Sequence, residues 1–440
     1  MSLAFAADEH HPMVDALLRT RVPRWEGLNR AIDERDDMLD FALQIFDYDR
    51  DRALTSYFQN ALEQYALVRH VAAWRTAGRG PLGKMLDFAS GYGRLTRLLV
   101  HERLADEVTV SDILEGGMEF QARQFGVRTI LSTTDPAQFA APEKYDLIFV
   151  ASLFTHLPEA TFLAWLRRLA ELLTPDGLLV FSVHDELLAP EPFEGGIKFE
   201  SRSESRVLDV NDYGSTWVTE EYVRRQVAAI DPSFACIRMR RALAEWQDIY
   251  VVSPSPVPSP EPRRVPKGFV DRMEATAEGV HLHGWATGVT ERADRVDVRL
   301  GHRTEDAVVA TTRDFAPRPD VAAFVGADTA LESGWQIVIP HSRIRSYRYE
   351  VVTVSAWTRS GEERILFLGT LDSLKGHTAH EKARALEQAL GTQSQELATT
   401  RHDLAVAVHH RAELEAHIAA MKQSRFWKAR DAWFALKGKM

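Results

Sequence analysis

The chain has almost no cysteine and no long hydrophobic run, and each absence excludes a class of protein. Cys236 is the only cysteine among 440 residues, which excludes the intramolecular disulfide bonds that stabilise many small secreted proteins. No stretch approaches the roughly 20 apolar residues of a membrane-spanning helix. Residues 1–11 lack the basic segment and apolar core of a secretory signal. We therefore expect a cytoplasmic protein.

An excess of positive charge is also missing. The chain carries 63 acidic and 53 basic residues, which gives a net charge of -10. That balance argues against a nucleic-acid partner, because a surface that binds phosphates needs a general positive potential. It leaves room for a local basic patch. The shares of hydrophobic (45%) and charged (26%) residues are ordinary for a globular protein.

The most informative pattern that is present runs from Leu86 to Arg97, LDFASGYGRLTR. An apolar run ends at Asp87, a turn with Gly91 and Gly93 follows, and a helix opens. In a parallel α/β sheet, such a turn lies at the carboxyl end of the first strand and forms a nucleotide-sized crevice. Asp112 ends the next strand-like run roughly 20 residues later, at the distance from which an acid reaches a ribose diol. The sequence therefore predicts a nucleotide-binding α/β domain.

The acid at the strand end indicates which nucleotide. Asp87 would repel a pyrophosphate but could accept hydrogen bonds from an ammonium group. The turn, D-x-A-x-G-x-G, resembles motif I of the class I S-adenosylmethionine-dependent methyltransferases. The landmarks that follow in family order are a strand and loop over 144–157, a helix over 162–173, a turn over 174–177 and a buried strand over 178–183. The resemblance implies a Rossmann-like fold and S-adenosylmethionine as cofactor.

The resemblance also implies which residues contact the cofactor: Asp87, Ala89, Gly91, Gly93, Asp112, Ile113, Asp135 and Ser152. Asp87 and the glycines would shape the methionine end, Asp112 would bind the ribose hydroxyls, and Ile113 would face the adenine. Asp135 or Thr134 would reach the adenine amine, although an Asp-Pro pair also favours a helix N-cap. Ala89 replaces the family's first glycine, and we expect an ordinary negative φ there, since positive φ is costly for a residue with a Cβ.

A hydroxyl acceptor would need a general base, because an alcohol is a poor nucleophile. His156 and His184 follow the fourth and fifth predicted strands, at the edge where such a base must lie. The alternatives are a helix cap for His156 and a structural hydrogen bond for His184. Residues 211–214 would form a loop on the acceptor side. His281 and His283 share a strand face without a third ligand, so we expect no metal site.

The rest of the chain divides by composition. Residues 1–45 are charged and predicted to be helical, and the methyltransferase domain spans 46–252. It includes a helix over 51–76, whose Tyr57 or Phe58 closes the cofactor pocket or is simply part of the core. Residues 253–267 are a proline-rich linker. Alternating runs over 268–371 predict a small antiparallel β-sandwich, similar to modules attached to bacterial glycan-assembly enzymes.

The C-terminal region has a heptad pattern and then a basic end. A coiled coil is predicted over 376–423, with Leu386, Leu390, Leu397 and Leu404 on its seam, and it implies a homo-oligomer. Residues 424–440 are basic and rich in aromatic residues, which suits an anionic membrane surface. We therefore expect peripheral contact with the inner face of the membrane, or alternatively packing of this tail on protein.

Together these patterns predict an S-adenosylmethionine-dependent methyltransferase that O-methylates a saccharide or glycan precursor in cell-surface polysaccharide assembly. The prediction of a glycan acceptor rests on the other domains in the chain, which is an argument by analogy. One alternative is a methyltransferase of a small metabolite or natural product. The other is a non-catalytic scaffold that keeps a degenerate methyltransferase fold, for which Ala89 is the only hint.

Overall fold

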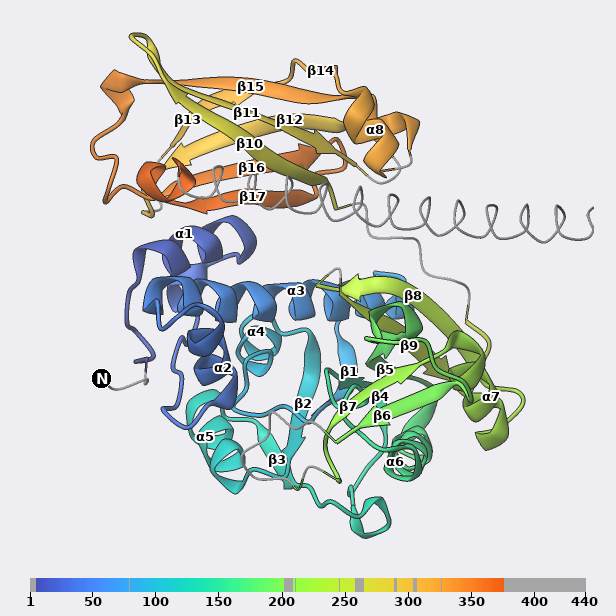
Figure 1. The fold of residues 1–440 in the computed structure, drawn as a ribbon. Coiled ribbons are helices and arrows are strands. Elements are labelled where there is room, and N and C mark those ends of the chain that lie inside the picture. Colours follow the sequence, from blue (N-terminus) through green and yellow to red (C-terminus); the bar gives the residue numbers. More distant parts are fainter. Residues whose placement is uncertain are drawn as a thin grey trace, which may run out of the picture.

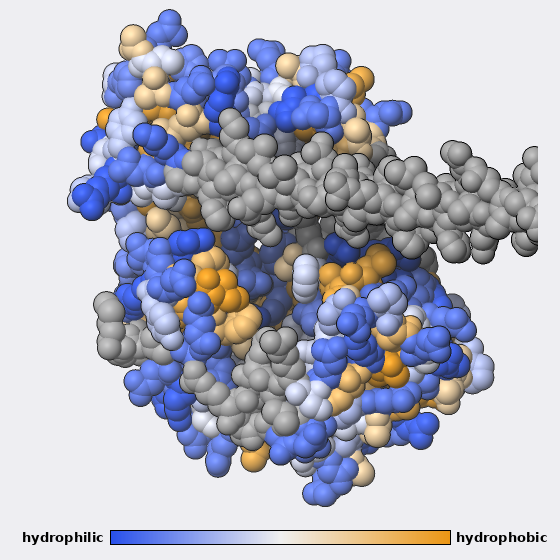
Figure 2. All heavy atoms as spheres, in the orientation of Figure 1, coloured by the Kyte–Doolittle hydropathy of each residue, from blue (hydrophilic) through white to orange (hydrophobic). Residues whose placement is uncertain are grey.

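A computed structural model describes residues 5–78, 80–201, 209, 211–244, 246–257, 265–288, 291–303, 307–325 and 327–375. Three N-terminal helices lie against a mixed α/β sheet, and two smaller antiparallel sheets lie above them in Figure 1. Figure 2 shows a hollow in the same face, with hydrophobic surface on both sides of it.

The N-terminal helices are α1 (Pro12–Arg21), α2 (Asp37–Ile45) and α3 (Arg50–Thr76), with the short 3-10 turn η1 (Trp25–Gly27) after α1. Asp36 and Asp49 are the N-caps of α2 and α3, because their carboxylates accept hydrogen bonds from the backbone N–H groups of Met38 and Arg52. The helix predicted over 51–76 is confirmed as α3. Its apolar residues share one core with α1, α2 and one face of the sheet.

The central sheet is built on five parallel strands: β1 (Leu82–Phe88), β2 (Ala105–Asp112), β3 (Arg128–Leu131), β4 (Tyr145–Val150) and β5 (Leu173–Asp185). They lie in the order β3-β2-β1-β4-β5. The order reverses between β1 and β4, and in such sheets ligands bind outside the carboxyl ends of the strands at this switch point. The predicted Rossmann-like α/β fold is thus confirmed.

Helices and antiparallel strands complete the domain. The helices are α4 (Thr96–His101), α5 (Glu115–Phe125), α6 (Glu159–Glu171) and α7 (Glu220–Ile230), with short 3-10 turns η2 (Pro136–Gln138) and η3 (Glu186–Leu188). Strand β9 (Gln247–Ser253) pairs antiparallel with β5, and β8 (Ala235–Leu243) pairs with β9. The end of β5 also pairs with β7 (Ser215–Val218), which pairs with β6 (Ile197–Glu200).

One predicted boundary in this sheet is wrong. Residues 174–177 were expected to form a turn before a strand that starts at Leu178, but β5 already begins at Leu173. Leu173 pairs with Tyr145, Leu178 pairs with Leu147, and the register shifts between these two pairs. The Thr-Pro-Asp-Gly segment is therefore an irregularity inside a longer strand.

Residues 265–375 form two four-stranded antiparallel sheets that share one hydrophobic core, here called the two-sheet module. The first sheet contains β10 (Lys267–Ala275), β11 (Gly279–Thr287), β15 (Glu332–Pro340) and β14 (Ala316–Pro317). The second contains β13 (Val308–Thr312), β12 (Ala293–Leu300), β16 (Val352–Thr358) and β17 (Glu363–Gly369). Helix α8 (Pro319–Val325) and the 3-10 turns η4 (Asp328–Ala330) and η5 (His341–Arg343) connect strands.

The two-sheet module contacts the N-terminal helices. Arg21 of α1 lies 3.6 Å from the buried carboxylate of Glu363 on β17, and Arg19 donates a hydrogen bond to the carbonyl of Gly301. Ile365 and Leu368 of β17 pack against the core of the N-terminal helices. The module is thus attached to the N-terminal helices by side-chain contacts.

Two predictions concern residues outside those that the structure describes, namely the coiled coil over 376–423 and the basic tail over 424–440. Within the described residues, no helix combines the length and apolar character needed to cross a membrane.

Candidate active site

The carboxyl ends of β1, β2, β4 and β5 bring most of the predicted site residues to one edge of the sheet. Asp87 lies near the end of β1 and Asp112 ends β2. Ser152 and His156 follow β4, and His184 lies at the end of β5. This edge includes the switch point between β1 and β4, so the parallel topology gathers these residues from distant parts of the sequence.

The loop after β1 has the backbone of a ligand-binding turn. Ala89, Gly91 and Gly93 have φ angles of 60°, 56° and 78°. The expectation of a negative φ at Ala89 is therefore wrong: the turn requires a left-handed residue at this position, and alanine occupies it despite its Cβ. A Cβ added at Gly91 would meet no atom within 4 Å, whereas one at Gly93 would lie 2.6 Å from Phe125. The loop therefore leaves free space beside Gly91, whereas Phe125 packs closely against Gly93.

Replacing Ala89 with glycine should stabilise the fold by about 0.5–1 kcal/mol. The substitution removes the left-handed penalty of an L-residue, and the greater freedom of glycine in the unfolded chain offsets part of that gain. Urea unfolding measures the difference. Ala73→Gly, in the exposed face of α3, is the control and should destabilise by about 1 kcal/mol. A destabilised Ala89→Gly variant would show that the loop is not strained.

Asp112 supports the same loop from the end of β2. Its Oδ2 accepts a hydrogen bond from the backbone N–H of Gly91 at 2.8 Å, and its Oδ1 accepts one from Leu114 at 3.0 Å. The side chain is 9% exposed, and burial raises the pKa of the carboxyl. Each carboxylate oxygen keeps a second lone pair for a ligand. The predicted ribose-binding residue is therefore also a structural brace of the turn.

Asp87 is held in a buried hydrogen-bond network. Gln121 donates through its Nε2 to Ser90 Oγ and to the carbonyl of Gly91, so its Oε1 must accept the hydroxyl proton of Thr96 at 2.7 Å. Thr96 Oγ1 also lies 3.0 Å from Asp87 Oδ2. Since a hydroxyl has one proton, the second contact is satisfied when Asp87 itself is protonated. Burial agrees with this, because it raises the pKa of Asp87 to about 7.

Asp87→Asn should therefore change how stability depends on pH. In the wild type the unfolded chain releases the Asp87 proton near pH 4 and the folded chain holds it to about 7. The free energy of unfolding should fall as pH rises through this window and level off above it. The variant lacks this loss, so its free energy of unfolding should rise relative to that of the wild type by up to about 4 kcal/mol between pH 4 and 8. Urea unfolding at several pH values checks this, with exposed Asp106→Asn as control. Parallel curves for Asp87→Asn and the wild type would contradict the protonated network.

A cluster of charged residues that no sequence pattern indicated lies beside this loop. Tyr57 donates to Asp36 Oδ2 at 2.6 Å, and Arg97 donates to the Tyr57 hydroxyl. The Arg94 guanidinium lies 5.9 Å from the Tyr57 ring. Arg94 has no hydrogen bond or ion pair to another described residue, and burial lowers its pKa. The carboxylates of Asp36 and Asp87 stabilise its charge without a hydrogen bond. A half-buried guanidinium beside the glycine turn is suited to bind a carboxylate.

Tyr57 and Phe58 were candidates to close the cofactor pocket. Both are buried and belong to the core that α3 shares with the sheet, the alternative given above. Tyr57 also joins Asp36 to Arg97 through its hydroxyl, so α3 reaches the cluster beside the loop. No single residue spacing marks this cluster, because its members come from the segment before α2, from α3 and from α4.

The remaining predicted cofactor contacts are placed differently. Ile113 is half-buried directly after Asp112. Asp135 is exposed and accepts a hydrogen bond from Ala137 N, so it is the N-cap of η2, the alternative noted above. Ser152 has a φ of 57°, donates its N–H to Ser182 Oγ and contacts Gln247 through its hydroxyl. It thus joins the ends of β4, β5 and β9.

The two candidate bases lie together. His156 Nδ1 lies 2.7 Å from the carbonyl of Gly214, so this nitrogen carries the proton and Nε2 is the acceptor. Tyr213 stacks on the His156 ring at 4.5 Å. Burial and the neighbouring His156 lower the pKa of His184 to about 4, so His184 is neutral at pH 7. The predicted loop over 211–214 therefore contacts a candidate base.

A metal site was not expected. Within the described ranges, no cluster of three or more His, Cys, Asp and Glu side chains has the geometry to hold a metal ion. The His281 and His283 rings are 6.4 Å apart and nearly parallel on β11.

Comparison with known proteins agrees with this fold. Residues 86–179 match the model of a family described as a methyltransferase domain. The match runs from β1 into β5 and includes the glycine turn, Asp112 and His156. These residues are therefore similar to a methyltransferase domain. No curated protein sequence matches the chain.

Several solved methyltransferases resemble part of the chain. An S-adenosylmethionine-dependent methyltransferase from Clostridium acetobutylicum is 13% identical, with 44% of this chain and 92% of that one covered and a TM-score of 0.33. A 1,6-didemethyltoxoflavin-N1-methyltransferase from Burkholderia thailandensis, solved with S-adenosylhomocysteine, is 20% identical, with coverages of 43% and 77% and a TM-score of 0.32. The glycopeptide N-methyltransferase MtfA with S-adenosylhomocysteine is 16% identical, with coverages of 42% and 87% and a TM-score of 0.31.

Proposed function

We propose that this chain is an S-adenosylmethionine-dependent methyltransferase that O-methylates a saccharide or glycan precursor in cell-surface polysaccharide assembly. The observation that carries the proposal is the joint placement of two units at one edge of the sheet. One is the glycine turn with Asp112, and the other is the histidine pair after β4 and β5. A donor site and a base for the acceptor are both needed for O-methylation.

The described residues fit the donor. Asp112 offers lone pairs to ribose hydroxyls, and the open side of Gly91 leaves room against the turn. Arg94 offers a guanidinium to the methionine carboxylate, as a charge-assisted hydrogen bond that it makes with no other described residue. When bound, the donor supplies a methyl group already activated by a sulfonium. The protein's task is then to orient the acceptor and exclude water.

His156 is the proposed general base. The Gly214 carbonyl accepts the Nδ1 proton, so Nε2 is the ring nitrogen that would accept the proton of a hydroxyl. His184 is neutral at pH 7 and does not add a positive charge that would oppose protonation of His156. His184 is thus proposed as a neutral neighbour of the base, or as the base itself if the acceptor lies closer to β5.

Aromatic rings beside the histidines support a saccharide acceptor. Tyr213 stacks on His156, and the Trp217 ring lies 6.3 Å from the His184 ring. Flat aromatic faces with a polar tip offer both an apolar surface and hydrogen bonds, which suits a ring that carries hydroxyls. The proposed coiled coil would join copies of the chain, and the proposed tail would bring them to the membrane.

Mass spectrometry of cell-envelope glycans tests the acceptor. Source cells that lack this chain should lose the mass of one methyl substituent from a surface saccharide, and the wild-type chain should restore it. The His156→Gln variant should not restore the methyl substituent. If envelope glycans are identical in both cells while a small metabolite loses its methyl group, the saccharide assignment is wrong.

A further inference from the structure

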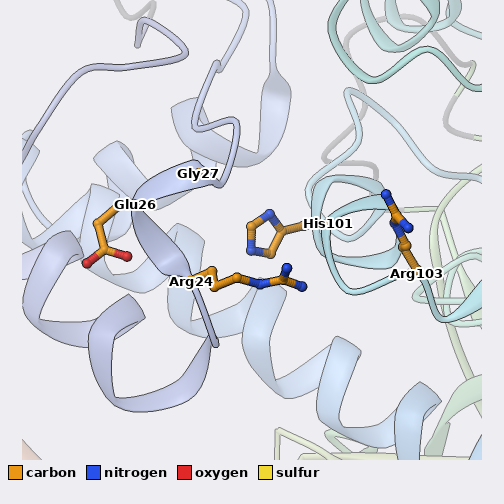
Figure 3. Close-up of a pocket in the computed structure, with 5 residues that line it drawn as sticks. All are labelled: Arg24, Glu26, Gly27, His101 and Arg103. Atoms are coloured by element: carbon orange, nitrogen blue, oxygen red, sulfur yellow. The ribbon is translucent and has the colours of Figure 1, made fainter.

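A second cavity lies away from the carboxyl edge of the sheet. Its volume is about 460 Å³, and it is lined by Arg24, Glu26, Gly27, His101 and Arg103 (Figure 3). Helix α4 begins beside the glycine turn and ends at His101, and β2 begins at Ala105. The cavity therefore lies at the opposite end of α4 from the proposed donor site.

The cavity is flanked by two arginines that the fold does not neutralise. The guanidinium groups of Arg24 and Arg103 have no hydrogen bond or ion pair to any residue in the described part of the chain. Both side chains are exposed. Most other arginines of this domain whose side chains are described, such as Arg128 and Arg238, are paired with carboxylates. A chain with a net charge of -10 thus presents a local cationic surface here.

His101 adds a third nitrogen-bearing side chain between the two arginines. Its Nε2 lies 3.1 Å from the carbonyl of Pro23 and 3.5 Å from Glu102, so Nε2 carries a proton. In Figure 3 the Arg24 and His101 side chains point toward one another, while the Glu26 carboxylate is directed away from them.

The backbone at both arginines is unusual. Arg24 and Arg103 have φ angles of 53° and 52°, in the left-handed region that L-residues with a Cβ seldom adopt. Such conformations persist only where the surroundings impose them, and they cluster at ligand sites. Here the conformations fall on the two residues whose guanidinium groups flank the cavity.

We propose that this cavity binds a phosphate-class oxyanion. The planar guanidinium presents paired N–H donors that match phosphate oxygens, and two such groups and an imidazole line this cavity. The phosphate could belong to a soluble phosphorylated compound or to a lipid headgroup, since both present the same chemistry. The inference is independent of the methyl-transfer site.

Titration calorimetry of the full chain with inorganic phosphate at low salt tests the proposal. We expect saturable binding that weakens as salt is added. Arg24→Gln and Arg103→Gln should each weaken it roughly tenfold, the usual effect of removing a charge-assisted hydrogen bond. Arg167→Gln makes the same charge change on the exposed face of α6 and should leave it unchanged. Retained binding of S-adenosylhomocysteine shows that the variants are folded.

Absence of saturable binding, or equal affinity in all variants, would overturn the proposal.

Vesicle flotation separates the two sources of phosphate. If the double variant Arg24→Gln/Arg103→Gln loses flotation with phosphatidylglycerol vesicles that the wild type retains, the ligand is a lipid headgroup. If the two float alike while phosphate binding still differs between them, the ligand is a soluble phosphorylated compound. Either result supports an oxyanion site.

Discussion

His156→Gln is expected to lower the rate constant of methyl transfer by about 10²–10⁴-fold, the usual contribution of a general base. Glutamine keeps a side chain near the Gly214 carbonyl and beside Tyr213 but cannot accept a proton at neutral pH. The affinity for S-adenosylhomocysteine should stay within experimental error, since His156 is not placed in the donor site. Transfer of a labelled methyl group to envelope saccharides from cells lacking the chain measures the rate.

His281→Gln is the matched control, because it removes an imidazole from the two-sheet module and should leave the rate unchanged. A wild-type rate for His156→Gln would remove this residue from the mechanism. In that case His184→Gln decides whether the second histidine is the base. If both variants keep the wild-type rate of methyl transfer, the acceptor needs no general base.

Asp112→Ala is expected to weaken S-adenosylhomocysteine binding by about 1–3 kcal/mol, which is roughly 10–100-fold or slightly more. The variant loses the acceptor of two backbone N–H groups, at Gly91 and Leu114, as well as the oxygens proposed for the ribose. Asp106→Ala removes the same charge from the exposed start of β2 and should bind normally. Calorimetry measures the dissociation constants.

Thermal unfolding without cofactor separates the two roles of Asp112. A large loss of stability together with weaker binding would mean that the loop itself has changed. A small loss of stability with weaker binding would mean that direct contacts were removed. An unchanged dissociation constant would exclude Asp112 from the site.

The parts of the site that follow one another along a strand and its turn could be predicted from the sequence. Gly91, Gly93 and Asp112 were recognised because the carboxyl ends of neighbouring parallel strands share an edge. The helix α3 was recognised from its apolar stripe. These features depend on local periodicity and on the general geometry of parallel sheets, which a single sequence carries.

Other features depend on contacts between distant residues. The cluster of Asp36, Tyr57 and Arg94 joins three separate segments, so no spacing marks it. The predicted sign of φ at Ala89 was wrong because the prediction used the intrinsic preference of alanine, whereas the turn determines the backbone conformation here. The predicted start of β5 was wrong because Pro-Asp-Gly is locally typical of a turn. Pairing of Leu173 with Tyr145 nevertheless extends the strand to Leu173.

Equilibrium binding of S-adenosylhomocysteine to the full chain tests the central claim most directly. We predict saturable binding of one molecule per chain, reduced roughly 10–100-fold by Asp112→Ala and retained by His156→Gln. The absence of saturable binding in a folded wild-type chain would contradict the account and favour a scaffold that keeps the methyltransferase fold without its donor site.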